Sequence, residues 1–149
     1  MSTDVKEEEL KTAGELERQL TQGIRTLHLS QLGHAPQKIS CHLFGNQLAV
    51  VMEGSFLTVE QLFLHNEYPE LAESVRATID ELLRPSLVEV IETTLKVNVN
   101  TVLSNSCSES KVTGIITMLD KTPAVRNPAA IPKTKLFKKR RLRERENAK

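Results

Sequence analysis

The sequence lacks tryptophan and is poor in aromatic residues, since its 149 residues include one tyrosine and four phenylalanines. A core of this chain must therefore be built from Leu, Val and Ile, and an aromatic platform for stacking nucleobases is nearly excluded. No stretch approaches the roughly 20 apolar residues of a membrane span, and the first ten residues are too acidic for a secretory signal. We therefore expect a cytoplasmic protein.

Cysteine is also scarce, and Cys41 and Cys107 lie far apart, so we expect two free thiols. The common phosphate-binding and hydrolase motifs, GxxxxGK[ST], GxGxxG and GxSxG, are absent from the sequence. The candidate metal ligands are His28, His34, Cys41 and His42, but adjacent residues on a strand face opposite ways. The sequence therefore predicts no enzyme, no cofactor and no metal site.

Charge is nearly balanced over the whole chain, with 20 Lys and Arg against 19 Asp and Glu. Residues 133–149 hold nine basic and two acidic side chains, a net charge of +7, so residues 1–132 carry a net charge of −6. Pro123, Pro128 and Pro132 mark the boundary, because proline interrupts helices and sheet ladders. We predict a folded domain at 1–120, a linker at 121–132 and a disordered basic tail at 133–149.

Within the predicted domain, apolar residues recur at spacings of three and four from Leu10 to Leu27 and predict an amphipathic helix that ends at Gly33. Alternating residues on both sides of Gly45-Asn46 predict a hairpin over 39–52. Thr58 and Gln61 fit the capping box of a short helix.

A second long helix is predicted to begin at Pro69, with a kink or a break near Leu82 because Pro85 removes one backbone N–H. Residues 97–118 then predict a second hairpin. The duplicated α-β-β order indicates an α+β fold, a two-layer sandwich of two long helices on a four-stranded, mainly antiparallel sheet.

The other face of that sheet should be apolar, and the alternation assigns five residues to it: Ala49, Val51, Val102, Ile115 and Leu119. Such a face is too apolar for free solvent. We therefore expect a homodimer through sheet faces or edges.

The tail supplies the candidate binding residues, which are Lys138, Lys139, Arg140, Arg141, Arg143 and Arg145. These cations could attract anionic lipid or neutralise the phosphates of nucleic acid. Leu136, Phe137 and Leu142 lie between them and could enter a membrane surface, whereas on RNA only Phe137 could stack. A solubilising tail, or one that folds back on the acidic body, is a third reading of the same residues.

Four local features of the chain resemble a known bacterial family. They are the hairpin ISCHLFGNQLAVVMEG, the run GSFLTVEQ with Gly54, Leu57, Thr58 and Glu60, the Arg84-Pro85 pair, and IETTLKVNVNTVLSN. Together they span about residues 10–120 and are similar to the MpsC family, named for the third component of a sodium-linked membrane potential-generating system. Members often carry a glycine where this sequence reads Leu95-Lys96.

The resemblance implies a non-enzymatic accessory protein associated with a membrane system for sodium, membrane potential or inorganic carbon. With the basic tail, it implies a cytoplasmic protein, peripheral at the membrane, that contacts a transport complex. A nucleic-acid-associated protein that uses the same tail is the alternative function. The linker and the tail lie outside the resemblance.

Overall fold

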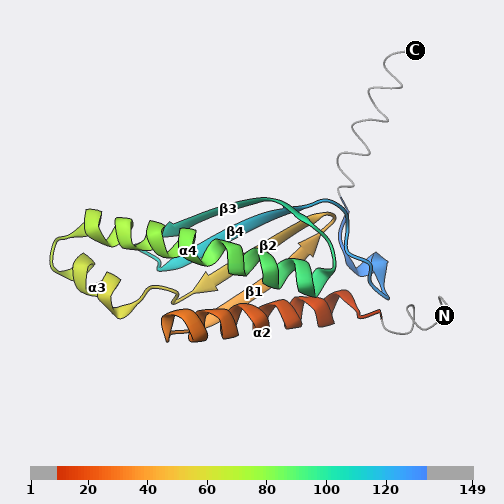
Figure 1. Cartoon of the computed structure of the whole chain (residues 1–149), viewed down its shortest axis with the longest axis horizontal. Helices are drawn as coiled ribbons and strands as arrows, with labels where there is room; N and C mark the ends of the chain where they lie inside the picture. The colour runs from red at the N-terminus through yellow and green to blue at the C-terminus, as the bar shows by residue number, and fades with distance from the viewer. Residues whose placement is uncertain (1–9, 134–149) are drawn as a thin grey trace, which may run out of the picture.

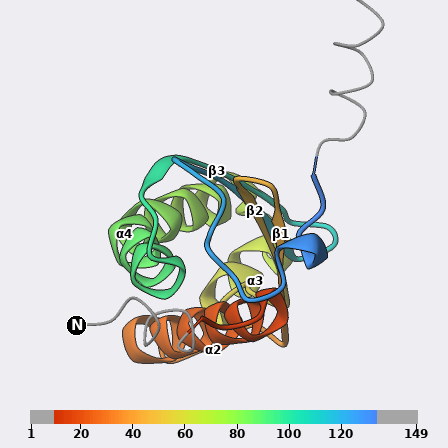
Figure 2. The same cartoon turned by 90° about the vertical axis from the view of Figure 1, so that its right-hand side faces the viewer.

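The computed structural model describes residues 10–133, which form an α+β fold with a four-stranded antiparallel sheet, as predicted. The elements follow in the order α2 (Ala13–Leu32), β1 (Lys38–Phe44), β2 (Gln47–Glu53), α3 (Thr58–His65), α4 (Pro69–Leu95), β3 (Val99–Cys107), β4 (Val112–Leu119) and η1 (Pro128–Ala130). Helices α2 and α4 lie on one side of the sheet (Figures 1 and 2).

Helix α2 has both ends capped. The Thr12 hydroxyl accepts the backbone N–H of Glu15 at 3.1 Å. At the other end Gly33 takes φ +67° and donates its N–H to the carbonyl of Leu29 at 3.0 Å. The predicted helix and its stop at Gly33 are confirmed.

The strand order is β1-β2-β4-β3, so the two hairpins meet at the centre of the sheet through β2 and β4. Val50 lies opposite Ile115 there, and both are buried. The core gathers where α2 and the second half of α4 cover β1, β2 and β4, and its fully buried members include Leu20, Ile24, Leu48, Ile91 and Leu119.

The sheet face turned away from α2 and α4, here called the open face, differs in part from the prediction. Ala49 and Val51 lie on it, but Ile115 and Leu119 are buried beneath the helices and Val102 packs against the core. The assignment of these three residues was wrong for two reasons. Strand β4 carries apolar residues on both faces, so its alternation is ambiguous, and the β3 register shifts between Val99 and Thr101.

Leu103, Ile116, Met118 and Phe44 belong to the open face instead. Leu103 is 61% exposed and Ile116 43% exposed. The open face therefore has an apolar centre on β2 and β4, while Ser40, His42 and Asn105 make its two outer strands partly polar. Only Ala49 and Val51 of the predicted residues belong to it.

The helices α3 and α4 correct two further expectations. Leu57, and not Thr58, is the N-cap of α3, and the Glu60 carboxylate accepts the Leu57 N–H at 2.9 Å. Helix α4 runs through Pro85 without a break, with Leu83 and Leu87 buried on both sides of it. The predictions of a Thr58–Gln61 capping box and of a helix break near Leu82 are therefore wrong. The predicted kink near Leu82 stays a prediction.

Residues 121–133 run along the body of the protein. Val125 and Ile131 are buried in the core cluster. The Asn127 side chain accepts the N–H of Ala13 at 2.8 Å, and Gly45 donates to the carbonyl of Pro132 at 2.8 Å. This segment therefore fastens the start of α2 and the β1–β2 turn to the end of the described chain.

Candidate functional site

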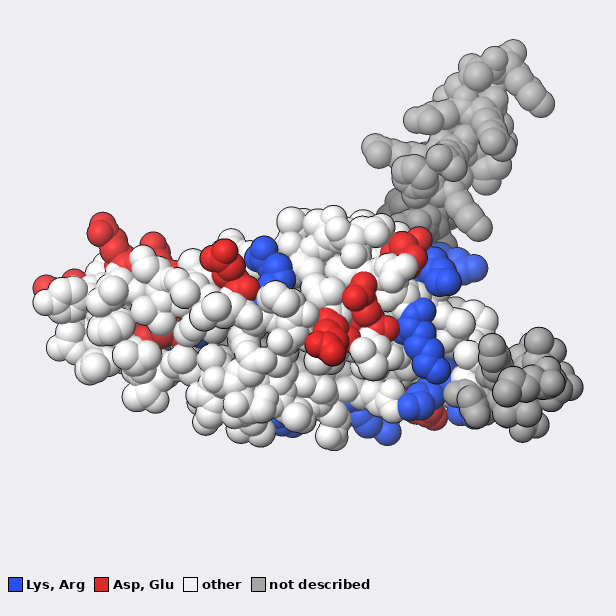
Figure 3. Space-filling view, viewed as in Figure 1, with Lys and Arg blue, Asp and Glu red and all other residues white. Residues whose placement is uncertain are grey.

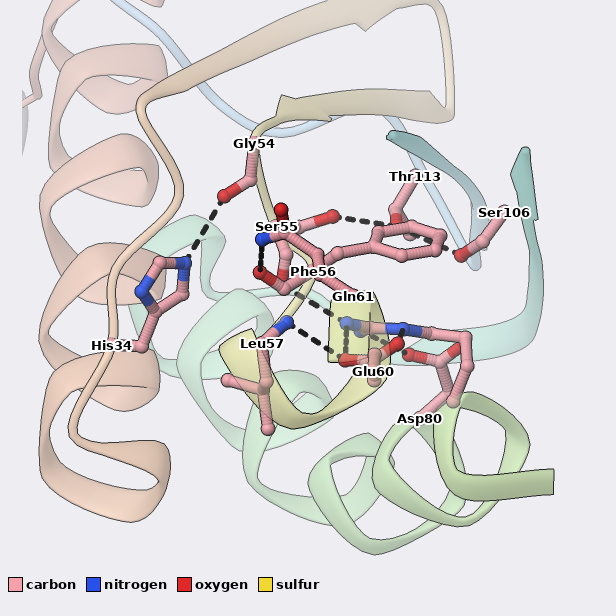
Figure 4. A network of polar contacts seen from close by, with 11 residues as sticks. His34, Gly54, Ser55, Phe56, Leu57, Glu60, Gln61, Asp80, Ser106 and Thr113 are labelled. Carbon is pink, nitrogen blue, oxygen red and sulfur yellow. Dashed lines mark hydrogen bonds and ion pairs between the residues drawn. The ribbon is translucent and has the colours of Figure 1, made fainter. Parts of the chain in front are cut away.

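A buried ion pair joins α3 to α4. Glu60 is fully buried and Arg76 is 6% exposed. The Arg76 guanidinium donates from Nε to Glu60 Oε2 at 2.8 Å and from Nη2 to Glu60 Oε1, in the two-pronged geometry that suits arginine and carboxylate. Nη2 also donates to the carbonyl of Ser55 at 3.0 Å (Figure 4).

The segment between β2 and α3 places these groups. Gly54 turns the chain with φ +67°, where a Cβ would come within 2.8 Å of Gln37 Cγ. His34 Nε2 donates to the Gly54 carbonyl at 3.1 Å. Phe56 follows, and the Arg76 guanidinium carbon stands 4.8 Å from its ring centre.

Hydroxyl groups extend the polar network into the sheet. Ser55 Oγ lies 2.9 Å from Thr113 Oγ1, which lies 2.8 Å from Ser106 Oγ (Figure 4). The Thr117 hydroxyl, on the same face of β4, is buried and has no partner among the described residues. The sheet beneath the first half of α4 is thus polar, in contrast to the apolar sheet beneath α2.

Asp80 borders this network on α4. Arg76 Nη1 donates to its Oδ1 at 3.4 Å. Burial raises the pKa of the Asp80 carboxyl, and the charge of Arg76 offsets only part of that rise.

A cleft of about 360 Å³ opens beside the network, between the first half of α4 and the second half of β3. Its lining includes Glu73, Ala77, Asp80 and Arg84 from α4 and residues 104–106 and 108 from β3 and the following turn. The cleft offers hydroxyl and amide groups, one exposed cation and two carboxylates. These groups can form hydrogen bonds and ion pairs with a polar chain or molecule.

The candidate metal ligands are spread over the fold. His28 is buried in α2, where its Nδ1 donates to the carbonyl of Ile24 at 2.9 Å and burial lowers its pKa. Burial raises the pKa of the Cys41 thiol in the core, and His42 points to the open face. Residues 10–133 contain no group of three His, Cys, Asp or Glu side chains that could hold a metal ion.

The predicted binding residues of the tail, Lys138 to Arg145, lie outside the described residues. Sequence reasoning missed the Glu60–Arg76 pair. One signal could have found it, since Arg76 falls on the apolar stripe of α4 formed by Ala72, Ile79 and Leu83.

Comparison with known families decides the relationship. Residues 12–121 match the family described as Na+-translocating membrane potential-generating system (MpsC). The chain belongs to the MpsC family. No curated protein and no solved structure matches it.

One feature that suggested MpsC membership, and one position where the sequence departs from the family, have physical roles in the structure. In the run GSFLTVEQ, Gly54 makes the turn and Glu60 forms the buried ion pair, so this run builds the polar network. Lys96, where members of the MpsC family often carry glycine, takes a left-handed conformation with φ 56°.

Among residues 10–133 of this MpsC-family chain, no helix combines the length and apolar character needed to cross a bilayer.

Proposed function

We propose that this MpsC-family chain is a non-enzymatic accessory protein of a sodium-linked membrane-potential system and that it acts as a homodimer through protein contacts. The observation that carries the proposal is the apolar open face of the sheet, which α2 and α4 leave uncovered. Family membership supports the association with the membrane system.

The apolar residues of the open face form rows across neighbouring strands. Ala49 lies opposite Ile116, which lies opposite Leu103 on the other side of β4. Val51 and Met118 lie in the adjacent rows. Neighbours in such rows share one face of the sheet, so their side chains form one surface and not isolated exposed residues.

Charge favours a second copy as the occupant of this face. In the four strands, the only Lys, Arg, Asp and Glu side chains are Lys38 and Glu53, which form an exposed pair at 3.9 Å at one end of the sheet. Two copies related by a twofold axis can therefore stack their open faces without repulsion between like charges.

Leu103→Asp tests the dimer by placing a charge on the open face, next to Ile116 of β4. We expect sedimentation velocity to give a dimer for the natural chain at micromolar concentration and a monomer for the variant. Leu62→Asp is the matched control, since Leu62 is a similarly exposed leucine, 57% against 61%, on α3. A natural chain that is monomeric, or a Leu103→Asp dimer, would contradict the proposal.

We further propose that the tail tethers the protein to an anionic membrane surface through Lys138, Lys139, Arg140, Arg141, Arg143 and Arg145. Flotation with vesicles containing anionic lipid should carry the full chain, and replacing these six residues by glutamine should abolish flotation. A gel shift on RNA and DNA over a salt series tests the alternative, in which the tail binds nucleic acid. Nucleic-acid binding without flotation would favour the alternative function.

A further inference from the structure

The two edges of the sheet are covered differently. At the β1 edge, Glu17 of α2 accepts the backbone N–H of Leu43 at 2.9 Å. Strand β3 has no charged side chain along its nine residues. After Val99, the backbone N–H groups of β3 that face β4 form hydrogen bonds within the sheet. Within residues 10–133, the only other hydrogen bond from these later N–H groups of β3 joins the Ser106 N–H to the Asn105 side chain. Because charged residues and covering elements normally protect an edge, the β3 edge is open to another extended chain.

The cleft runs along this edge as a groove between a strand and a helix. Its α4 wall extends from Ala72 to Arg84, which is about 18 Å at 1.5 Å per residue. That length fits about five extended residues. Ala77, Ser104 and Ser106 are small enough to let a backbone approach the strand, the arrangement in which peptides add to a sheet edge.

The helices beside the groove carry a net negative charge that favours a basic occupant, and the groove wall itself holds Glu73 and Asp80 together with Arg76 and Arg84. Residues 57–84 of α3 and α4 contain six Asp and Glu and two Arg, a net charge of −4, and Arg76 is already bound to Glu60. Acidic side chains gather at the end of the molecule where α3 and α4 lie (Figure 3). Glu73 is an exposed carboxylate on the groove wall.

The chain contains a segment of matching chemistry. Residues 134–149 hold eight Lys and Arg against two Glu, with Leu136, Phe137 and Leu142 between them. The described chain ends beside the β1–β2 turn, about 25 Å from the groove by strand spacing and rise. Sixteen extended residues span about 53 Å, so the segment can reach the groove around the sheet.

We propose that the chain's own C-terminal segment, residues 134–149, adds to the edge of β3 and occupies the groove, with its cations beside Glu73. In the absence of a membrane, the cations proposed to bind its anionic surface are then held in the groove of the folded domain. This inference does not rest on the membrane role, because groove binding is measured without lipid.

Cys107 provides a native reporter, since it is exposed at the end of β3, between the groove-lining residues Ser106 and Ser108, whereas Cys41 is buried. A spin label on Cys107 of the full chain should bleach the amide NMR signals of the tail. Glu73→Lys should restore these signals, and so should high salt. Glu89→Lys, on an exposed residue of α4 that does not line the groove, is the matched control and should leave the bleaching intact.

Unbleached tail signals, or equal bleaching in the Glu73→Lys and Glu89→Lys variants, would overturn the proposal. Unchanged signals from the body would establish that each variant is folded. A mixture of spin-labelled chain and isotope-enriched chain without the spin label tests whether the tail in the groove comes from the same chain or from a second copy. Bleaching seen only in that mixture would overturn the assignment to the chain's own segment in favour of a second copy.

Discussion

The buried pair Glu60–Arg76 joins α3, α4 and the segment between β2 and α3 through one guanidinium. Arg76 contacts Glu60, Asp80 and the Ser55 carbonyl at once. Removing one partner would leave the other charge buried, and an unpaired buried charge is far more costly than a missing exposed pair. Arg76 also lines the cleft, so these contacts hold part of its wall.

Arg76→Met should lower the free energy of unfolding by about 3–5 kcal/mol, because it strands the Glu60 carboxylate. The double variant Glu60→Gln/Arg76→Met should recover part of this loss. Arg126→Met is the control, since its pair with Glu15 at 3.3 Å is exposed and should cost under about 1 kcal/mol. Urea unfolding followed by far-ultraviolet circular dichroism measures all three. Equal losses for Arg76→Met and Arg126→Met would refute the prediction.

His28 should make stability depend on pH. Burial lowers its pKa in the folded state. The hydrogen bond to the Ile24 carbonyl and the charge of Asp80 oppose this lowering, and Arg76 and His34 add to it. The unfolded chain therefore takes up the proton first, and the free energy of unfolding should fall as pH drops through about 6.5. Burial raises the pKa of Asp80, so this group should make the free energy of unfolding rise as the pH falls further. The contribution of His28 is therefore measured as the difference between the natural chain and a variant that lacks it.

Replacing His28 by glutamine removes the titrating group. We expect the free energy of unfolding of this variant to change less than that of the natural chain between about pH 7.5 and pH 5.5. Urea titrations at a series of pH values provide the comparison. Parallel curves for the two proteins would show that His28 does not carry the dependence.

At the scale of elements, the end of α4 holds a conformation that its residue does not favour. Lys96 takes φ 56° and its N–H bonds to the Glu92 carbonyl at 2.8 Å. Lys96→Gly should raise the free energy of unfolding by about 1 kcal/mol, because glycine reaches the left-handed region without a Cβ clash. Lys96→Ala keeps the Cβ and serves as the control in the same denaturation series. A glycine variant no more stable than the alanine variant would contradict this reading.

Elements with a strong local signal could be predicted from the sequence. The caps and apolar stripe define α2, and Gly45-Asn46 defines the first hairpin. The faces of β3 and β4 could not be predicted, because β4 carries apolar residues on both faces and the shift after Val99 reverses the alternation of β3. Those assignments depend on pairing with β2, which is a contact between distant parts of the chain.

The polar network was only partly predictable for a related reason. An arginine within the apolar stripe of α4 signals a buried partner, but not which one. Glu60 meets Arg76 because the Gly54 turn directs α3 toward α4, and Thr113 completes the hydroxyl chain from another hairpin. Sequence spacing does not encode such convergence of three elements.

At the scale of the whole molecule, residues 121–133 contribute to the core from the far end of the chain. Val125 and Ile131 are 7% and 3% exposed. Val125→Ala and Ile131→Ala should each lower the free energy of unfolding, Ile131→Ala by about 2–4 kcal/mol. Val59→Ala is the control, because Val59 is 42% exposed on α3. Ile131→Ala as stable as Val59→Ala would show that this segment does not add to the core.

The fastening of the last described residues to the start of α2 has a mechanical consequence. Lys11 accepts the N–H of Arg126, and both ends of the described chain emerge at the same pole of the molecule (Figure 1). A force that pulls these ends apart would load the few contacts at that pole one after another, as in unzipping, while the β-ladders carry little of the load. The α3–α4 pole would be the last part of the protein to feel the tension.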